Sequence, residues 1–149
     1  MKLELKDAER VEGVLEMDIY RRGELIEHIV EYNIVVDGGR TRLAQLIAGK
    51  STAGVKYIGF GTGGNIPKIA DADLTNRYLK EIDSATVVGN DAVFKWTLTE
   101  TEPANGLDIR EFGLYSSDAT PILLTRLVRA RVIGKDADMV IDGTYTLHF

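Results

Sequence analysis

The sequence contains no cysteine, which excludes disulfide bonds, a thiolate nucleophile and the common cysteine-ligated zinc sites. No apolar run approaches the roughly 20 residues that a membrane-spanning helix needs, and the N-terminal stretch MKLELKDAERVEGVLEMD is too charged for a signal peptide. Basic residues are not in excess, because 18 Lys and Arg face 23 Asp and Glu and give a net charge of −5. We therefore expect a soluble protein that uses no membrane and binds no nucleic acid.

The charges are spread unevenly along the 149 residues. Residues 1–37 hold five basic and ten acidic residues, whereas residues 38–149 hold thirteen of each. Within the second part, residues 121–135 contain no acid and four basic residues, Arg126, Arg129, Arg131 and Lys135. These regions are interpreted either as solvated faces or as complementary surfaces, within one chain or between copies.

Most of the chain has the period-2 alternation of β-strands. Residues 11–36 consist of two such runs around the turn Arg22-Gly23, which predicts a long hairpin. VKYIGF is a short strand that leads into a glycine-rich loop, and Gly89-Asn90 is a turn before the strand AVFKWTLT. The last strand is the clearest, because one face carries Met139, Ile141, Tyr145, Leu147 and Phe149.

Two segments have helical spacing instead. Asp37 or Thr41 is expected to cap a helix in which Leu43, Leu46 and Ile47 share a face, and Gly49 is expected to end it. Further on, Leu74, Tyr78 and Ile82 stand four apart after Asp71 and Asp73. That spacing is interpreted as either a short helix or an irregular arm.

The loop YIGFGTGGNIP contains Gly59, Gly61 and Gly64 at the spacing of a dinucleotide-binding fingerprint. Such a loop has to open a helix, but Pro67 disfavours the helical conformation in the residue before it. The βαβ unit that surrounds a true fingerprint is not evident either. We therefore expect this loop to bind no nucleotide, and the sequence predicts no cofactor.

Metal-binding and nucleophilic signatures are also missing. His28 and His148 each fall in a predicted strand without a second ligand at metal spacing, so both are interpreted as ordinary strand residues. Asp-Ala-Asp occurs at 71–73 and again at 136–138, but without the Gly and the distal Glu of a calcium loop. These aspartates are interpreted as helix-start and turn residues.

The stretch GLDIREFGLYSSDATPILLTRLVRARV predicts a hairpin whose loop is residues 117–120. In that register Glu111 lies opposite Arg126, in a row that is otherwise apolar. Alone, either charge would be costly there, whereas together they satisfy each other. The pair is interpreted as a structural ion pair that fixes the register, with a catalytic Glu oriented by an Arg as the alternative.

Several blocks in this order resemble phage tail-fibre and tail-collar-type proteins, over about residues 30–149: NIVVDGGRTRLAQLIAG, YIGFGTGG, LDIREFGLYSSDATPILLTRLV and TYTLHF. The matching positions are Asn33, Leu43, Ala44, Leu46, Gly59, Gly61, Glu111, Gly113, Leu114 and Arg126. The resemblance implies a tail component of the virion, made in the host cytoplasm, in which an oligomeric β-rich domain attaches an appendage to a tail or baseplate. No repetitive shaft or receptor-binding tip follows, so an adaptor, collar or baseplate part is expected rather than a complete fibre. Gly59, Gly61 and Gly63 then become structural glycines where backbones approach closely.

These observations predict one mostly β domain over residues 1–149, an antiparallel β-sandwich or barrel with one or two short helices, from which residues 11–36 protrude as a hairpin. The first hypothesis is a noncatalytic structural tail protein that assembles with copies of itself, preferably as a trimer, and with other tail or baseplate proteins. A second hypothesis is a small-ligand or carbohydrate-binding domain, which requires exposed aromatics such as Tyr20, Tyr32 or Tyr57 to gather in one groove. The third is a hydrolase using Glu111, which requires a pocket and a second titratable group beside it.

Overall fold

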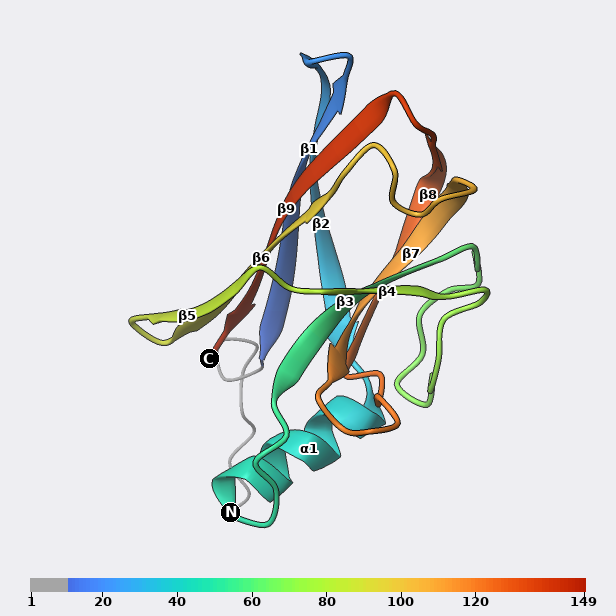
Figure 1. Cartoon of the computed structure of the whole chain (residues 1–149). Coiled ribbons are helices and arrows are strands. Elements are labelled where there is room, and N and C mark those ends of the chain that lie inside the picture. The colour runs from blue at the N-terminus through green and yellow to red at the C-terminus, as the bar shows by residue number, and fades with distance from the viewer. Residues whose placement is uncertain (1–10) are drawn as a thin grey trace, which may run out of the picture.

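The computed structural model describes residues 11–149, which form one curled antiparallel sheet and a short helix (Figure 1). The strands are β1 (Glu12–Arg21), β2 (Glu24–Val35), β3 (Val55–Gly61), β4 (Tyr78–Glu81), β5 (Ser84–Val88), β6 (Asp91–Leu98), β7 (Leu107–Ser116), β8 (Thr125–Lys135) and β9 (Met139–His148), and the helix is α1 (Asp37–Ile47). The nine strands follow the order β4-β3-β7-β8-β2-β1-β9-β6-β5. The prediction of a mostly β, antiparallel domain of the sandwich or barrel kind is confirmed.

The two ends of this sheet are joined by almost no intervening chain. Only two residues separate β4 from β5, although these strands lie at opposite ends of the strand order. The N–H of Ile82 donates to the Lys56 carbonyl of β3 at 3.0 Å, and the N–H of Asp83 donates to the Lys95 carbonyl of β6 at 2.8 Å. The β4–β5 segment therefore crosses from one end of the sheet to the other and curls it into a half-barrel (Figure 1).

The main core lies on the concave face of the curled sheet. The alternation predicted in the last strand is confirmed for Met139, Ile141, Tyr145 and Leu147, which are buried, whereas Phe149 lies beyond the end of β9 and is exposed. Other strands contribute an aromatic centre, in which Phe60 meets Trp96 and Phe112 edge-on with ring centroids 5.1 and 5.7 Å apart. Such edge-to-face contacts add specific geometry to the burial of apolar area.

A smaller core lies on the other face, where β3 and β7 are covered by residues 62–77. We call this segment the arm, and it contains neither helix nor strand. Leu74 from the arm packs with Val36, Tyr115 and Leu123. The spacing of Leu74, Tyr78 and Ile82 was therefore not helical: the irregular alternative holds, and β4 begins at Tyr78.

The predicted hairpin of residues 11–36 is confirmed as β1 and β2. Its turn contains two residues with positive φ, Arg22 at 50° and Gly23 at 82°. Most of the hairpin lies within the sheet, because β1 pairs with β9 from Glu12↔His148 to Arg21↔Met139.

The helix is where the sequence-based details were least accurate. The N-cap residue is Val36 and no side chain caps the helix, so the expected capping by Asp37 or Thr41 is wrong. The buried residues are Gly39 and Arg42, whereas Ile47 is 88% exposed. The reason is close packing: a Cβ on Gly38 would lie 2.7 Å from the Leu123 carbonyl oxygen, so the glycines face the β7–β8 loop. Gly49, with φ of 68°, follows the helix as predicted. Within residues 11–149, no helix has the length and apolar character needed to span a bilayer.

Candidate functional site

Glu111 and Arg126 form a buried ion pair between β7 and β8. Arg126 Nε donates to Glu111 Oε1 at 3.0 Å, and the two side chains are only 6% and 1% exposed. The second guanidinium nitrogen, Nη1, binds Asp71 Oδ2 in the arm at 2.8 Å. Arg126 therefore links two carboxylates from separate segments.

The predicted register of this hairpin is wrong, although the pair forms: the error is one residue at Tyr115, which lies opposite Leu123, two residues at Glu111, and five at Ile109, which lies opposite Ile133. Glu111 lies opposite Val128, not Arg126, and pairing is irregular between Ile109 and Glu111. A shift of two keeps each side chain on the same face of a strand. Glu111 and Arg126 are therefore diagonal neighbours and still make contact.

Backbone donors complete the surroundings of Glu111. The N–H groups of Gly63 and Thr75 donate to Oε2 at 2.6 and 2.9 Å. The carboxylate thus accepts three hydrogen bonds from the protein itself and binds the arm to β7 at two points. A substrate has no access to Glu111 in this conformation, because its side chain is 1% exposed.

The glycines of the loop make room for these side chains. A Cβ on Gly61 would lie 2.7 Å from Glu111 Oε2, and one on Gly63 would lie closer still. A Cβ on Gly59 would lie 2.5 Å from the Tyr115 ring, and Gly64 lies against the Arg110 guanidinium. No helix follows these glycines before β4. From the sequence, these glycines were expected to allow two backbones to approach closely. In the structure, their small size makes room mainly for neighbouring side chains.

Tyr115 fixes the arm at a third point. Its hydroxyl donates to Asp73 Oδ1 at 2.7 Å and accepts from the Leu74 N–H at 3.1 Å. Arg77 lies over the Tyr115 ring, 5.2 Å from its centroid. Burial raises the pKa of the Tyr115 phenol above its ordinary value, and the bond to Asp73 raises it further. Asp71 and Asp73 therefore hold the arm by accepting from Arg126 and Tyr115, and the prediction that they start a helix is wrong.

Three further residues of the resemblance serve packing. Leu114 is fully buried, and its N–H donates to Thr125 Oγ1 at 3.0 Å. A Cβ on Gly113 would lie 2.5 Å from the Thr125 carbonyl oxygen. Asn33 pairs with Gly13 across the hairpin, and its amide occupies the space that a Cβ at Gly13 would need.

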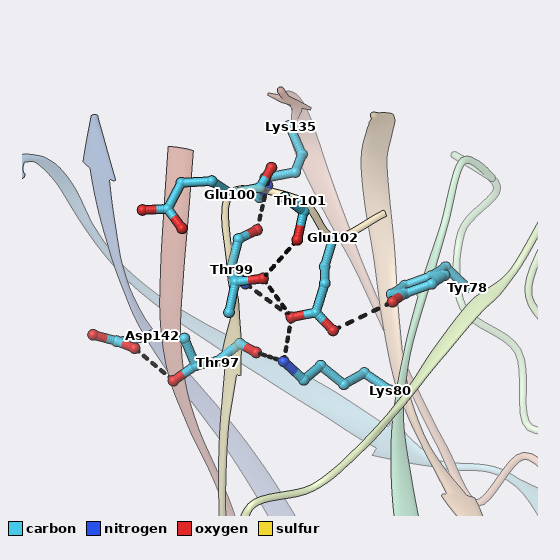
Figure 2. Close-up of polar contacts among 9 residues, drawn as sticks. All are labelled: Tyr78, Lys80, Thr97, Thr99, Glu100, Thr101, Glu102, Lys135 and Asp142. Carbon is cyan, nitrogen blue, oxygen red and sulfur yellow. Dashed lines mark hydrogen bonds and ion pairs between the residues drawn. The ribbon is translucent and has the colours of Figure 1, made fainter. Parts of the chain in front are cut away.

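A polar cluster that the sequence did not indicate bridges β4 and β6 (Figure 2). Lys80 donates both to the Thr97 carbonyl and to Glu102 Oε1, and the same oxygen accepts from the Thr99 hydroxyl at 2.8 Å. Lys135 reaches in from β8 and donates to the Thr99 carbonyl at 2.9 Å. The members come from four separate segments, so no local spacing could have revealed them.

The charges in this cluster stabilise each other. Burial of the Glu102 carboxyl group opposes its ionisation, but hydrogen bonds from Lys80 and Thr99 outweigh burial and lower its pKa to about 2. Burial lowers the pKa of the Lys135 ammonium group. The cluster closes the side of the half-barrel where β4 and β6 are not joined by strand pairing.

Tyr20, Tyr32 and Tyr57 do not gather in one groove, as a ligand-binding site built from these three aromatic residues would require. Tyr20 pairs with Leu25 near the hairpin turn, whereas Tyr32 pairs with Val14. The two tyrosines are thus about 20 Å apart along the strands, and Tyr57 lies on β3, separated from β2 by β7 and β8. A shallow groove of about 420 Å³ does cross β1, β6 and β9, but its lining is mainly polar and contains none of the three.

The histidines are strand residues, as expected. His28 Nδ1 lies 2.6 Å from Asp18 Oδ1, and His148 Nδ1 lies 2.7 Å from Asp91 Oδ1. Over the described part of the chain, no group of three or more His, Asp or Glu side chains is arranged to hold a metal ion.

Most basic side chains of residues 121–135 are buried and do not form a surface patch. Arg126, Arg129 and Lys135 are buried, and only Arg131 among its basic residues is exposed. Arg129 binds Glu31 and Glu27 of β2 at 3.3 and 3.4 Å. Complementarity with the acidic N-terminal third therefore operates within one chain at this point.

Exposed apolar side chains gather on β2. They are Leu25, Ile26, Val30 and Tyr32, with exposed fractions of 56, 52, 43 and 72%. Ile26, Val30 and Tyr32 alternate on the face away from the main core, and we call these three residues the β2 row. Val30 and Tyr32 are neighbours on this face, and His28 stands between Val30 and Ile26. Exposed apolar side chains mark interaction sites when they form a patch.

Comparisons with protein-family models, curated proteins and solved structures gave no match for the chain.

Proposed function

We propose that this chain is a noncatalytic structural component of a phage or phage-derived tail. It works by assembling with copies of itself, preferably as a trimer, and with other tail or baseplate proteins. The order of sequence blocks resembles that of tail-fibre and tail-collar-type proteins, and this resemblance supports a phage tail as the assembly in which the chain works. The observation that carries an assembly role is the β2 row, because three large apolar side chains exposed on one face of a strand suit a surface that a partner covers.

The surroundings of Glu111 favour a structural role over a catalytic one. A general acid or base has to exchange a proton with a substrate within hydrogen-bond reach. Glu111 instead accepts three bonds from Arg126, Gly63 and Thr75. Those bonds hold the arm on β7, which is the use expected of a rigid assembly module.

The test is genetic and structural. The gene is deleted from the phage or prophage that carries it, and particles are examined by electron microscopy and by mass spectrometry of purified virions. We expect mass spectrometry to find the chain in wild-type particles. After the deletion, we expect electron microscopy to show tails that lack an appendage. Complete tails without the chain would contradict the proposal.

A complementing variant separates the structural from the enzymatic hypothesis. Replacing both members of the buried pair, as Glu111→Met with Arg126→Met, removes the carboxylate without stranding a charge, and such exchanges are often tolerated. We expect this variant to restore the tails. If a stably folded double variant enters particles yet fails to restore them, a hydrolase that uses Glu111 gains support.

A further inference from the structure

An apolar cavity of about 50 Å³ lies between α1 and the end of the half-barrel at which β1 begins. Figure 1 shows the helix placed beyond that end of the sheet. Strand ends form one side of the cavity and the helix forms the other, with Val11, Val55, Thr125 and Leu147 on the sheet side and Leu43 and Leu46 on the helix side. We call this space the base cavity.

The polar side chains in the walls of the base cavity already have partners. Thr125 Oγ1 accepts from the Leu114 N–H at 3.0 Å. Arg42 donates to the Ala53 carbonyl at 2.9 Å and to Asp118 Oδ2 at 2.7 Å. Because a buried water molecule needs several polar partners, these walls suit an apolar group better than water.

The size of the base cavity favours an aliphatic side chain over a free ligand. Pockets for drug-sized molecules measure about 300–1,000 Å³, which is far more than the volume found here. Even benzene occupies an engineered cavity of about 150 Å³. We therefore expect the occupant to be a side chain of a polypeptide segment.

The helix is the wall with the least cover. A surface helix usually buries an apolar stripe, but α1 buries only Gly39 and Arg42. Leu43 and Leu46 are half-buried beside the cavity, and Ile47 is 88% exposed. Within residues 11–149, the C-terminal half of α1 therefore keeps apolar surface that a further segment could cover.

We propose that residues 1–10 of the same chain cover the base cavity, with Leu3 and Leu5 packed against α1. These ten residues lie outside the described part of the chain. The residue that follows them, Val11, is itself part of the cavity wall, so the segment joins the fold at the cavity. This inference goes beyond the proposed function and does not depend on it, because it concerns a contact inside one chain.

The sequence and the length of this segment fit the base cavity. Apolar and charged side chains alternate at its start: Met1, Lys2, Leu3, Glu4, Leu5 and Lys6. In an extended conformation the three apolar side chains share one side. The chain from Leu5 to Val11 can span about 20 Å, whereas the 11 residues of α1 are about 16 Å long. The two leucines can therefore reach any point along the helix.

Urea denaturation followed by Trp96 fluorescence measures what the leucines contribute. Leu3→Ser with Leu5→Ser removes both apolar side chains, and Glu4→Ser with Lys6→Ser is a matched control that keeps the leucines and the net charge. We expect the leucine variant to lower the urea midpoint by at least about 0.5 M and the control to shift it by less than about 0.25 M. A leucine variant with the midpoint of the wild type would overturn the proposal.

A double-mutant cycle tests where the leucines bind. If they touch the helix, Leu46→Ser should shift the midpoint by at least about 0.25 M less in the leucine variant than in the wild type. Val132→Ser, at a position of β8 that is 51% exposed, should cause the same shift in both backgrounds. Equal shifts for Leu46→Ser in the two backgrounds would place the leucines elsewhere and overturn the contact with α1.

Cross-linking separates a docked segment from one that is merely tethered nearby. The sequence contains no cysteine, so only introduced pairs can react. Leu5→Cys with Leu46→Cys tests the apolar side of the segment, and Glu4→Cys with Leu46→Cys tests the charged side on nearly the same tether. We expect oxidation of dilute protein to join the first pair within one chain at least about tenfold faster, because a disulfide requires Cβ atoms within about 4.5 Å.

Two outcomes of the cross-linking would overturn the proposal. Equal rates for the two pairs would mean that the segment has no docked orientation, and cross-links between chains would mean that a second copy supplies the segment. Circular dichroism checks that each variant is folded. If Leu46→Cys does not fold, Leu43→Cys replaces it, and Leu5→Ser alone replaces a leucine variant that does not fold.

Discussion

Replacing Arg126 with alanine should destabilise the fold far more than removing an exposed ion pair. The substitution deletes the Nε donor to Glu111 and the Nη1 donor to Asp71. Glu111 cannot compensate by binding water, because it is 1% exposed. It would remain a buried carboxylate with only the Gly63 and Thr75 N–H groups as donors.

The size of the loss follows from this geometry. Breaking a buried pair by removing one partner costs about 3–5 kcal/mol. Two backbone donors still serve Glu111, so we expect a value near the lower end, about 3 kcal/mol. The control is Arg77→Ala, because Arg77 and Asp73 are 34% and 57% exposed. An exposed pair contributes less than about 1 kcal/mol, and the contact of Arg77 with the Tyr115 ring adds about 0.5–1 kcal/mol, so the control should lose less than about 2 kcal/mol.

Urea denaturation followed by fluorescence provides the assay. Trp96 is the sole tryptophan and is 1% exposed, so its emission reports loss of the main core. With a slope of about 2 kcal/mol per molar urea, 3 kcal/mol moves the midpoint down by about 1.5 M. A shift for Arg126→Ala no larger than for Arg77→Ala would refute the argument that Glu111 depends on its partner.

Three more outcomes are expected. The pKa of Glu102 is about 2 in the fold, below the ordinary 4.5, so the stability that its ionised form contributes is present above pH 4.5 and is lost as the pH falls toward 2. Glu102→Gln should therefore lower the free energy of unfolding by about 1 kcal/mol at neutral pH, after screening is allowed for. Urea midpoints measured at decreasing pH should show this difference from the wild type vanishing between pH 4.5 and 2. Gly63→Ala should cost about 2 kcal/mol by crowding Glu111, whereas Gly54→Ala, with no atom within 4 Å of the added Cβ, should cost less than about 1 kcal/mol in the same assay. Titration with NAD, ATP or FAD should change neither Trp96 fluorescence nor the melting temperature, and a micromolar response would restore the nucleotide interpretation of the glycine loop.

Local patterns in the sequence were enough to predict the strands that have one buried face. The alternation in β9 and the hairpin of β1 and β2 depend on neighbours two residues apart, which a sequence displays directly. The same applies to the turn between β5 and β6, where the φ of 60° at Gly89 suits the first residue of a two-residue hairpin turn. The proximity of Glu111 and Arg126 could also be predicted, because two opposite charges in an apolar row have few other ways to be satisfied.

Features that depend on distant segments could not be predicted in this way. The irregular pairing near Ile109 changes the register of β7 and β8 without any signal in composition. Asp71 and Asp73 resemble helix starts until Arg126 and Tyr115, more than 40 residues away, are brought beside them. Arg129 looked like a surface charge for the same reason, since its partners lie on β2.

The order of the strands also affects how the chain folds as it is synthesised. The inner face of β1 is covered only when the sheet has curled, and β1's second neighbour is β9, the last strand of the fold. At about 5–20 residues per second, the ribosome needs about 6–23 s to pass from the end of β2 at Val35 to the end of β9 at His148. During that time Leu15, Met17 and Ile19, which are buried in the finished fold, lack the neighbouring strand β9, so we expect the nascent hairpin to be open to chaperones and to association with neighbouring chains.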